Sequence, residues 1–125
     1  MDEKPNIIIA DDNEDCLFAL EKALSELECP IFRAHSGEEV LNILIERKIG
    51  LVILDIHMKG LDGYETAKLI RSRNRTKHIP LIFISGAEKG SITRFRDLET
   101  APVEYLFKPV DIDILIEKIA ALLDL

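Results

Sequence analysis

The amino-acid sequence predicts an α/β fold, with one doubly wound parallel sheet of five strands and five helices. Short apolar runs alternate with helical patterns along the whole chain. Several of these runs are apolar at nearly every position, which is typical of strands buried on both faces of a parallel sheet. The length of 125 residues suits a single domain with a sizeable core. Because strands and helices alternate strictly, the strands are expected to pair in parallel through helical crossovers.

The expected strands are short, rich in β-branched or aromatic residues, and bounded by turn residues. They comprise residues 6–10, 30–34, 51–55, 80–85 and 103–107. For a sheet ordered 2-1-3-4-5, ligands bind beyond the carboxyl ends of the strands, in the crevice between the first and third strands. A functional site is therefore expected where strands 6–10 and 51–55 end.

The first helix is predicted by apolar residues spaced three and four apart, which places them on one helix face. They are Leu17, Leu20, Leu24 and Leu27. Acidic and amide side chains favour a helix N-terminus, so one of Asp11, Asp12 and Asn13 is expected to cap this helix.

Four further helices are expected between and after the remaining strands. Ser36 and Glu39 form an S-x-x-E capping box that opens the second helix. The third helix is expected at about 62–73, the fourth at about 90–98, and the last from Asp111 onward. The basic run at 71–78 has two readings, a docking patch or the ordinary preference of cations for a helix C-terminus, and the second is favoured.

Composition narrows the class of protein. The chain is 47% hydrophobic and 31% charged, as an ordinary globular domain is, and its formal net charge of −7 argues against direct binding to nucleic acid or to an anionic membrane. No apolar run approaches the length of a membrane span and the first residues lack a signal core, so a cytoplasmic location is expected. Cys16 and Cys29 lack metal-ligand spacing and are expected to be reduced thiols, with Cys16 packed.

Three carboxylates follow the strands on either side of the expected crevice. Asp11 and Asp12 end the first strand and Asp55 ends the third. Carboxylates so close together raise one another's pKa unless a positive charge lies among them. Mg²⁺ is suited to this position because it takes oxygen ligands from one or two carboxylates and keeps room for a phosphoryl oxygen.

The other two strand ends add a hydroxyl and an ammonium. Ser85 follows the fourth strand and Lys108 the fifth. A carboxylate nucleophile, a metal platform, a hydroxyl and a lysine are the parts required for phosphoryl transfer to an aspartate, in which catalysis is mainly positioning and charge neutralisation. Serine after a strand is also common turn chemistry, and a lone aspartate there is more often a loop residue. The joint occurrence of Asp55 with Lys108-Pro109 favours a functional site over these ordinary readings.

The chain resembles the receiver domains of response regulators in two-component signalling. The resemblance spans about residues 5–124 and is carried by four motifs, "IIIADDN", "LVILDIHMKGLDG", "LIFISGA" and "EYLFKP", each at the end of its strand. It implies a flavodoxin-like fold with strand order 2-1-3-4-5. It also implies no enzymatic activity beyond the domain's own phosphorylation and dephosphorylation. Because the sequence ends within a residue or two of the last expected helix, we expect one domain at 1–125 without an output domain.

The resemblance also implies roles for the site residues. Asp55 is the expected phosphoacceptor and binds Mg²⁺ (or Mn²⁺) together with Asp12, while Asp11 acts through metal-bound water and the backbone carbonyl of His57 completes the protein ligands. Lys108 contacts the phosphoryl group, and its bond to Pro109 is expected to be cis.

Two further pairs of residues are assigned by the same resemblance. Ser85 and Tyr105 form the expected switch, in which Ser85 turns to the phosphoryl group and Tyr105 follows inward, although a tyrosine on a terminal strand is more often simple packing. His57 and Ala87 occupy the positions that tune the lifetime of the phosphoryl group. His57 is otherwise a solvated loop histidine.

The implied partners are a histidine kinase or phosphotransfer protein, and a downstream protein or further domains of a larger chain. They are expected to recognise the surface formed by the fourth helix, the strand 103–107 and the last helix. The chain itself is expected to be a monomer or a phosphorylation-dependent dimer. The alternative function is a phosphorylation-independent interaction module. A flavin carrier is disfavoured because "ADDNED" would repel a flavin phosphate, and a phosphohydrolase because the D-x-D pair of such enzymes is absent after the first strand.

Overall fold

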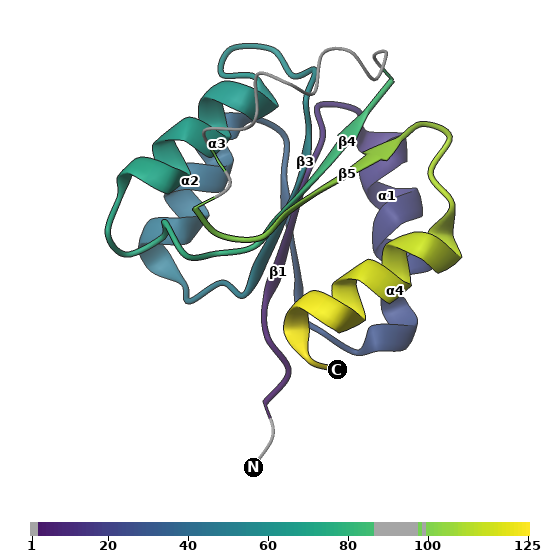
Figure 1. Cartoon of the computed structure of the whole chain (residues 1–125). Coiled ribbons are helices and arrows are strands. Elements are labelled where there is room, and N and C mark those ends of the chain that lie inside the picture. The colour runs from purple at the N-terminus through teal and green to yellow at the C-terminus, as the bar shows by residue number, and fades with distance from the viewer. Residues whose placement is uncertain (1–2, 87–97, 99) are drawn as a thin grey trace.

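A computed structural model describes residues 3–86, 98 and 100–125. They form one five-stranded parallel sheet in the order β2-β1-β3-β4-β5, which confirms the predicted topology (Figure 1). The strands are β1 (Ile7–Ala10), β2 (Ile31–Ala34), β3 (Leu51–Asp55), β4 (Leu81–Ser85) and β5 (Val103–Phe107). The predicted strand bounds are correct within one residue.

Four α-helices are present in the described part of the chain: α1 (Glu14–Ala23), α2 (Gly37–Glu46), α3 (Gly63–Ser72) and α4 (Ile112–Leu123). In Figure 1, α2 and α3 cover one face of the sheet, and α1 and α4 cover the other. The helix expected at about 90–98 lies outside the described residues, apart from the buried Leu98. None of the helices in the described ranges is long and apolar enough to span a bilayer.

The core consists of two layers, because alternate residues of each strand point to opposite faces of the sheet. Ile8 packs under α2 and α3, whereas Ile7 and Ile9 pack with Leu17 of α1 and Leu115 of α4. This explains why the central strands β1, β3 and β4 are apolar at nearly every position. The sheet is thus a rigid support whose carboxyl edge presents the ends of β1, β3 and β5.

The helix N-termini are capped by side chains, as the sequence predicts. Asn13 accepts from the backbone N–H of Cys16, and Asp111 caps α4. The complete capping box is found at α3, where Asp62 and Glu65 bond reciprocally, and not at α2. At α2, Ser36 accepts from the backbone N–H of Glu39, but the Glu39 carboxylate accepts from the N–H of His35 instead of completing the box.

Two predictions about the first helical segment require correction. The leucine stripe extends past α1, which ends at Ala23, into a short 3-10 helix at Ser25–Leu27. Leu24 is nevertheless buried, so the stripe follows the core contacts and not the helix bounds. Cys16, expected to be packed, is exposed, whereas Cys29 is buried, and both are free thiols.

Candidate functional site

Three ionisable side chains from three strand ends meet at the carboxyl edge of the sheet. Asp11 follows β1, Asp55 is the last residue of β3, and Lys108 follows β5. The Lys108 Nζ lies 2.8 Å from Asp55 Oδ2 and 3.7 Å from Asp11 Oδ2. Both acids are buried, with exposed fractions of 7% for Asp11 and 5% for Asp55. The sequence pattern thus produces a buried carboxylate pair bridged by one ammonium.

Backbone groups fix the orientation of both carboxylates. The N–H of His57 donates to Asp55 Oδ1 and the N–H of Asn13 donates to Asp11 Oδ1, each at 2.9 Å. The Oδ2 atom of each acid is therefore the one directed at Lys108. Lys108 is held in turn by its backbone N–H, which donates to the carbonyl of Ser85 at 2.8 Å, and its bond to Pro109 is cis.

Burial dominates the electrostatics of the pair. It raises the pKa of Asp11, against the lowering effect of the bond from Asn13, and the negative charge of Asp55 raises the pKa further. The pKa of Lys108 is raised, mainly by its hydrogen bond to Asp55. Two ionised carboxylates and one ammonium leave a net charge of −1 in a site largely withdrawn from water. Such a site favours the binding of an additional cation.

We expect the raised pKa of Asp11 to give a measurable pH dependence of stability. Because the native state holds this proton to a higher pH than the unfolded chain does, the free energy of unfolding falls as the pH rises from about the ordinary value of 3.8 through the folded pKa. Asp11→Asn removes this penalty, so the variant is expected to gain stability over wild type above that window and to lose the advantage below it. Urea unfolding at a series of pH values in metal-free buffer measures the difference, and a pH-independent difference would contradict it.

Asp12 differs from the other two acids. It is exposed, and its Oδ2 accepts from the backbone N–H of Lys59 at 3.3 Å, so it reaches across to the loop after β3. Within the part of the chain that the structure describes, no three histidine, cysteine or acidic side chains are grouped as metal ligands. Lys108 neutralises only one charge of the buried pair, so a third carboxylate at the same point would add uncompensated charge.

The donor set still fits Mg²⁺. All the side-chain donors at this edge are carboxylate oxygens, and Mg²⁺ requires only one or two of them because it retains several waters. Asp55 ends β3, and Asp12 and His57 belong to the loops after β1 and β3, which are joined by the hydrogen bond from the Lys59 N–H to Asp12.

Ser85 lies on β4, which is next to β3, and Tyr105 lies on β5, the edge strand beyond β4. Ser85 is buried at the end of β4, and Tyr105 is paired in register with Phe83. The rings of Tyr105 and Phe83 stack with their centroids 5.7 Å apart, and the Tyr105 hydroxyl oxygen is buried. Ala87 lies outside the described residues.

A cavity of about 280 Å³ opens beside the acids, between α1 and the segment that follows β5. Asp11 and Lys108 form its polar side, and Cys16, Leu20 and Ile112 are among the residues of its wall. Cys16 is therefore exposed because it lines a hollow, which a periodicity argument cannot predict.

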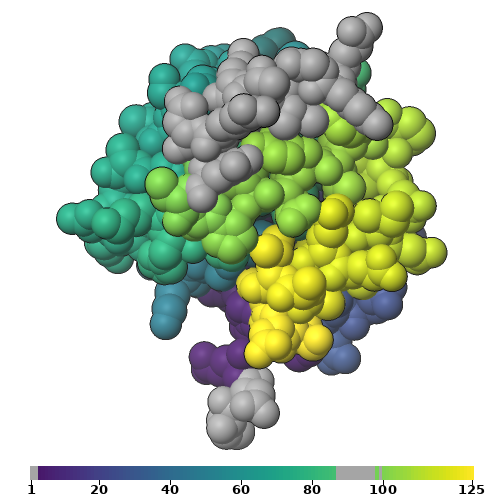
Figure 2. Space-filling model, viewed as in Figure 1, coloured from purple at the N-terminus to yellow at the C-terminus, as the bar shows by residue number. Residues whose placement is uncertain are grey.

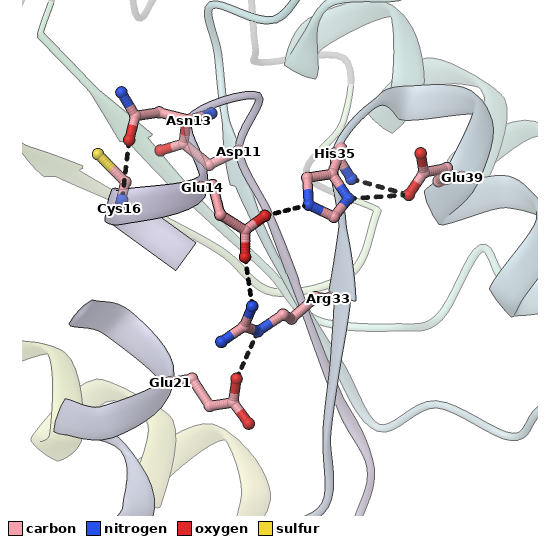
Figure 3. Close-up of polar contacts among 8 residues, drawn as sticks. All are labelled: Asp11, Asn13, Glu14, Cys16, Glu21, Arg33, His35 and Glu39. Carbon is pink, nitrogen blue, oxygen red and sulfur yellow. Dashed lines mark hydrogen bonds and ion pairs between the residues drawn. The ribbon is translucent and has the colours of Figure 1, made fainter. Parts of the chain in front are cut away.

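A network of ion pairs flanks the site on the β2 side (Figure 3). Glu14, in the first turn of α1, binds both Arg33 of β2 and the Nε2 of His35. The Nδ1 of His35 lies 3.3 Å from Glu39 Oε1, and Arg33 also binds Glu21. The network joins the first turn of α1 to β2 and the start of α2. The sequence does not reveal it, because its members are ordinary surface residues far apart in the chain.

We expect Glu14→Gln to lower the pKa of His35. The hydrogen bond to Glu14 is the main cause that raises this pKa above the ordinary 6.5, with the bond to Glu39 second. Protonated His35 therefore contributes stability that is present in full below pH 6.5 and is lost as the pH rises through the raised folded value. An NMR titration of the imidazole measures the shift of the His35 pKa. The control is Glu26→Gln, the same change at an exposed acid of the 3-10 helix. An unchanged His35 pKa in Glu14→Gln would show that the contact does not persist in solution.

Arg71 is a second residue whose role the sequence did not reveal. Its guanidinium donates to the carbonyls of Leu98, Lys77, Ile79 and Pro102, at 2.6 to 3.3 Å. It thereby fixes the ends of the chain segments that lead into β4 and β5. Arg71 is thus a structural residue and not part of a solvated charge run.

Comparison with known proteins now identifies the family. The model of the response regulator receiver domain matches residues 7–120, so the chain belongs to this family. This agrees with the parallel sheet, its strand order and the position of the acids at its carboxyl edge.

The curated relatives are longer proteins. The chain is 37% identical over 109 residues to a probable cyclic di-GMP phosphodiesterase of Vibrio cholerae, covering 87% of this chain and 24% of that protein. It is 32% identical to the transcriptional regulatory protein AfsQ1 of Streptomyces coelicolor, covering 95% of this chain and 51% of that protein. The chain therefore spans about half or less of the length of these relatives.

Solved structures agree. A response regulator receiver protein from Pseudomonas putida superposes with a TM-score of 0.87 at 28% identity, covering 97% of this chain and 99% of that one. A two-component response regulator from Clostridium difficile gives a TM-score of 0.85 at 29% identity, covering 97% of each chain. Receiver domains interact with kinases and downstream effectors, and they are generally not catalytic enzymes, although they occur within longer chains such as the phosphodiesterase relative.

Proposed function

We propose that the chain is a phosphorylation-dependent signalling switch of the cytoplasm, which accepts a phosphoryl group on Asp55 from the phosphohistidine of a histidine kinase or phosphotransfer protein. The observation that carries this proposal is the buried Asp11–Asp55 pair held by Lys108 at the carboxyl edge of the sheet. A carboxylate at this place is shielded from bulk water yet keeps a compensating cation within 2.8 Å. It is therefore suited to receive a phosphoryl group and to limit its hydrolysis.

In the proposed transfer, a carboxylate oxygen of Asp55 forms a bond to phosphorus while the bond from phosphorus to the donor imidazole breaks. The bond from the N–H of His57 keeps the Asp55 carboxylate in one orientation. Lys108 moves its charge from the carboxylate to the incoming phosphoryl oxygens, a role for which a compact ammonium is suited. The rest of the protein contributes positioning.

We assign Mg²⁺ (or Mn²⁺) to the acids at this edge. When bound, the ion would neutralise charge on the transferring phosphoryl group. Asp12 and Asp55 would bind it directly, with the carbonyl of His57, and Asp11 through water. The support is the uncompensated negative charge of the buried pair and the all-oxygen donor set.

Phosphorylation would be communicated through Ser85 and Tyr105 to the partner surface. Ser85 lies at the end of β4, one strand from Asp55, and Tyr105 stacks on the same strand through Phe83. The described part of the proposed surface consists of β5 and α4, which form much of the face seen in Figure 2. Its exposed apolar residues at the start of α4 are Ile112 and Ile114. A downstream protein, or further domains of a longer chain, would bind there, and the chain is a monomer or a phosphorylation-dependent dimer.

The test of the proposal is to incubate the wild-type chain with acetyl phosphate, with and without Mg²⁺, and to measure intact mass and the base lability of any adduct. We expect one acid-stable, base-labile phosphate that requires the ion. If acetyl phosphate and a phosphohistidine donor both fail, the chain is a receiver-shaped interaction module that acts without phosphorylation.

We also propose that His57 and Ala87 set the lifetime of the phosphoryl group. His57 is exposed two residues after Asp55, and its ring can therefore meet a water that approaches the phosphoryl group. We expect His57→Ala to change the first-order decay rate of phosphorylated protein by several-fold, which a time course of phosphate loss would measure. An unchanged decay rate would exclude the role. His78→Ala, at an exposed histidine near the amino edge of the sheet, is the matched control.

A further inference from the structure

The basic run 71–78 belongs to a groove at the amino edge of the sheet, opposite the acidic site. The segment 44–49 leads into β3 and the segment 71–79 leads into β4, so both lie where the strands begin. Together they hold six of the chain's 16 lysine and arginine residues but only one of its 23 acidic residues. A hollow of about 350 Å³ between them and an adjoining one of about 200 Å³ share Leu44, Arg75 and Thr76. We call this feature the basic groove.

The fold accounts for only two of these cations. The Arg71 guanidinium donates hydrogen bonds to four backbone carbonyls. The Arg47 guanidinium lies over the ring of Phe32, 4.7 Å from its centroid. The ion pairs of lysine and arginine among the described residues involve Arg33, Lys108 and Lys118. The exposed charges left over on the basic groove are Lys48, Arg73, Arg75 and Lys77. The preference of cations for a helix C-terminus acts within the last turn, where α3 has Arg71, and Arg75 and Lys77 lie beyond that turn.

The basic groove also has apolar surface. Its floor is formed by Leu44, Ile49 and Ile79, which are buried, while Ile45 on the wall of the smaller hollow is 60% exposed. A large exposed aliphatic side chain between cations suits an occupant that carries both negative charge and an apolar group.

From this charge and this surface we propose that the basic groove binds an acidic protein segment that contains an apolar side chain. Carboxylates of the segment would pair with Lys48, Arg73 and Arg75, and its apolar side chain would cover Ile45. The chain's net charge of −7 does not prevent this, because charges more than about 8 Å away are screened at physiological salt. The proposal is independent of phosphorylation at Asp55.

Two other anionic ligands fit less well. A compact phosphate prefers the N–H groups of a helix N-terminus, whereas α2 and α3 both end here and direct carbonyl groups to this edge. Single-stranded nucleic acid binds through base stacking, and the described residues that line the two hollows include no phenylalanine, tyrosine or tryptophan ring. An extended segment with separated carboxylates avoids both problems.

The test uses a short labelled peptide rich in glutamate with a central leucine, and the same peptide with glutamine in place of glutamate. We expect the acidic peptide to bind at physiological salt and to shift the backbone amides of 44–49 and 71–79 in ¹⁵N spectra. Arg75→Glu is expected to weaken binding roughly tenfold and Ile45→Ser a few-fold. The matched controls lie on α1, across the sheet: Lys22→Glu for the charge and the exposed Phe18→Ser for the apolar group.

Equal affinities for wild type, Arg75→Glu and Ile45→Ser would overturn the proposal, and so would amide shifts located elsewhere. Tighter binding of inorganic phosphate or of a single-stranded oligonucleotide than of the acidic peptide would also overturn it, in favour of those ligands. Because Asp55→Asn should leave peptide binding unchanged, the result does not depend on the proposed phosphorylation.

Discussion

Changing Asp55 to asparagine is expected to abolish phosphorylation of the chain while leaving its fold intact. The amide has nearly the shape of the carboxylate, and its oxygen can still accept the hydrogen bond from the N–H of His57. It lacks the nucleophilic carboxylate, so no acyl phosphate can form. Intact mass after incubation with acetyl phosphate and Mg²⁺ measures the loss. Asp113→Asn, the same chemical change at an exposed acid in the first turn of α4, is the control and should keep full phosphorylation.

The same variant gives an independent check on the electrostatics of the site. After burial, the charge of Asp55 is one of the causes that raise the pKa of Asp11, so Asp55→Asn should lower that pKa. An NMR titration of the Asp11 carboxyl detects the change without any phosphorylation. If phosphate still appeared on Asp55→Asn in an Mg²⁺-dependent manner, the acceptor would be another residue, and the neighbouring acids Asp11 and Asp12 would be the first to examine.

The sheet was predictable because it depends on a pattern that the chain repeats five times. Each strand is a short, mainly apolar run, and the central strands such as "LVILD" are buried at every residue. Strict alternation with helices leaves few topologies possible. The acids and Lys108 were predictable for the same reason: strand order alone brings the ends of β1, β3 and β5 to one edge.

What the sequence did not reveal depends on side-chain direction and on long-range partners. Asp12 is adjacent to Asp11, yet successive residues after a strand point apart, and its carboxylate bonds Lys59 instead of joining the buried pair. Glu39 accepts from the backbone N–H of His35, while Glu14 binds the ring of the same histidine from another helix. Arg71 resembles its basic neighbours in sequence and differs only in the four carbonyls that surround it. No rule of sequence spacing predicts these contacts, since each partner is brought close by the tertiary fold.

The glycine in "LDGYE" leads to the largest expected loss of stability. Gly63 is the first residue of α3, and its N–H donates to the carbonyl of Ile56 at 2.9 Å, which holds the helix start against the end of β3. A Cβ added at this position would lie 2.5 Å from the carbonyl oxygen of Asp55 and 2.8 Å from the Cα of Ile56. Both are backbone atoms, so they cannot move without displacing the strand end that carries the proposed phosphoacceptor.

Two effects of Gly63→Ala oppose each other. Alanine is the better helix former by up to about 1 kcal/mol, so propensity alone predicts stabilisation. Overpacking against fixed backbone costs about 1–3 kcal/mol, and a contact of 2.5 Å belongs at the upper end of that range. We therefore expect Gly63→Ala to lower the free energy of unfolding by about 2 kcal/mol and to slow phosphorylation, because Asp55 shifts relative to Lys108.

Urea unfolding measures the stability change, and Gly86→Ala is the matched control because a Cβ there meets no atom within 4 Å. A Gly63→Ala protein as stable as wild type would show that the close contact with the β3 backbone is relieved at little cost. In that case the phosphorylation rate separates two explanations. A normal rate would mean that the helix moves and Asp55 stays in place, whereas a slowed rate with unchanged stability would mean that the β3 end itself gives way. The second result would identify the contact between Gly63 and the Asp55 backbone as the feature that keeps the acidic pair aligned.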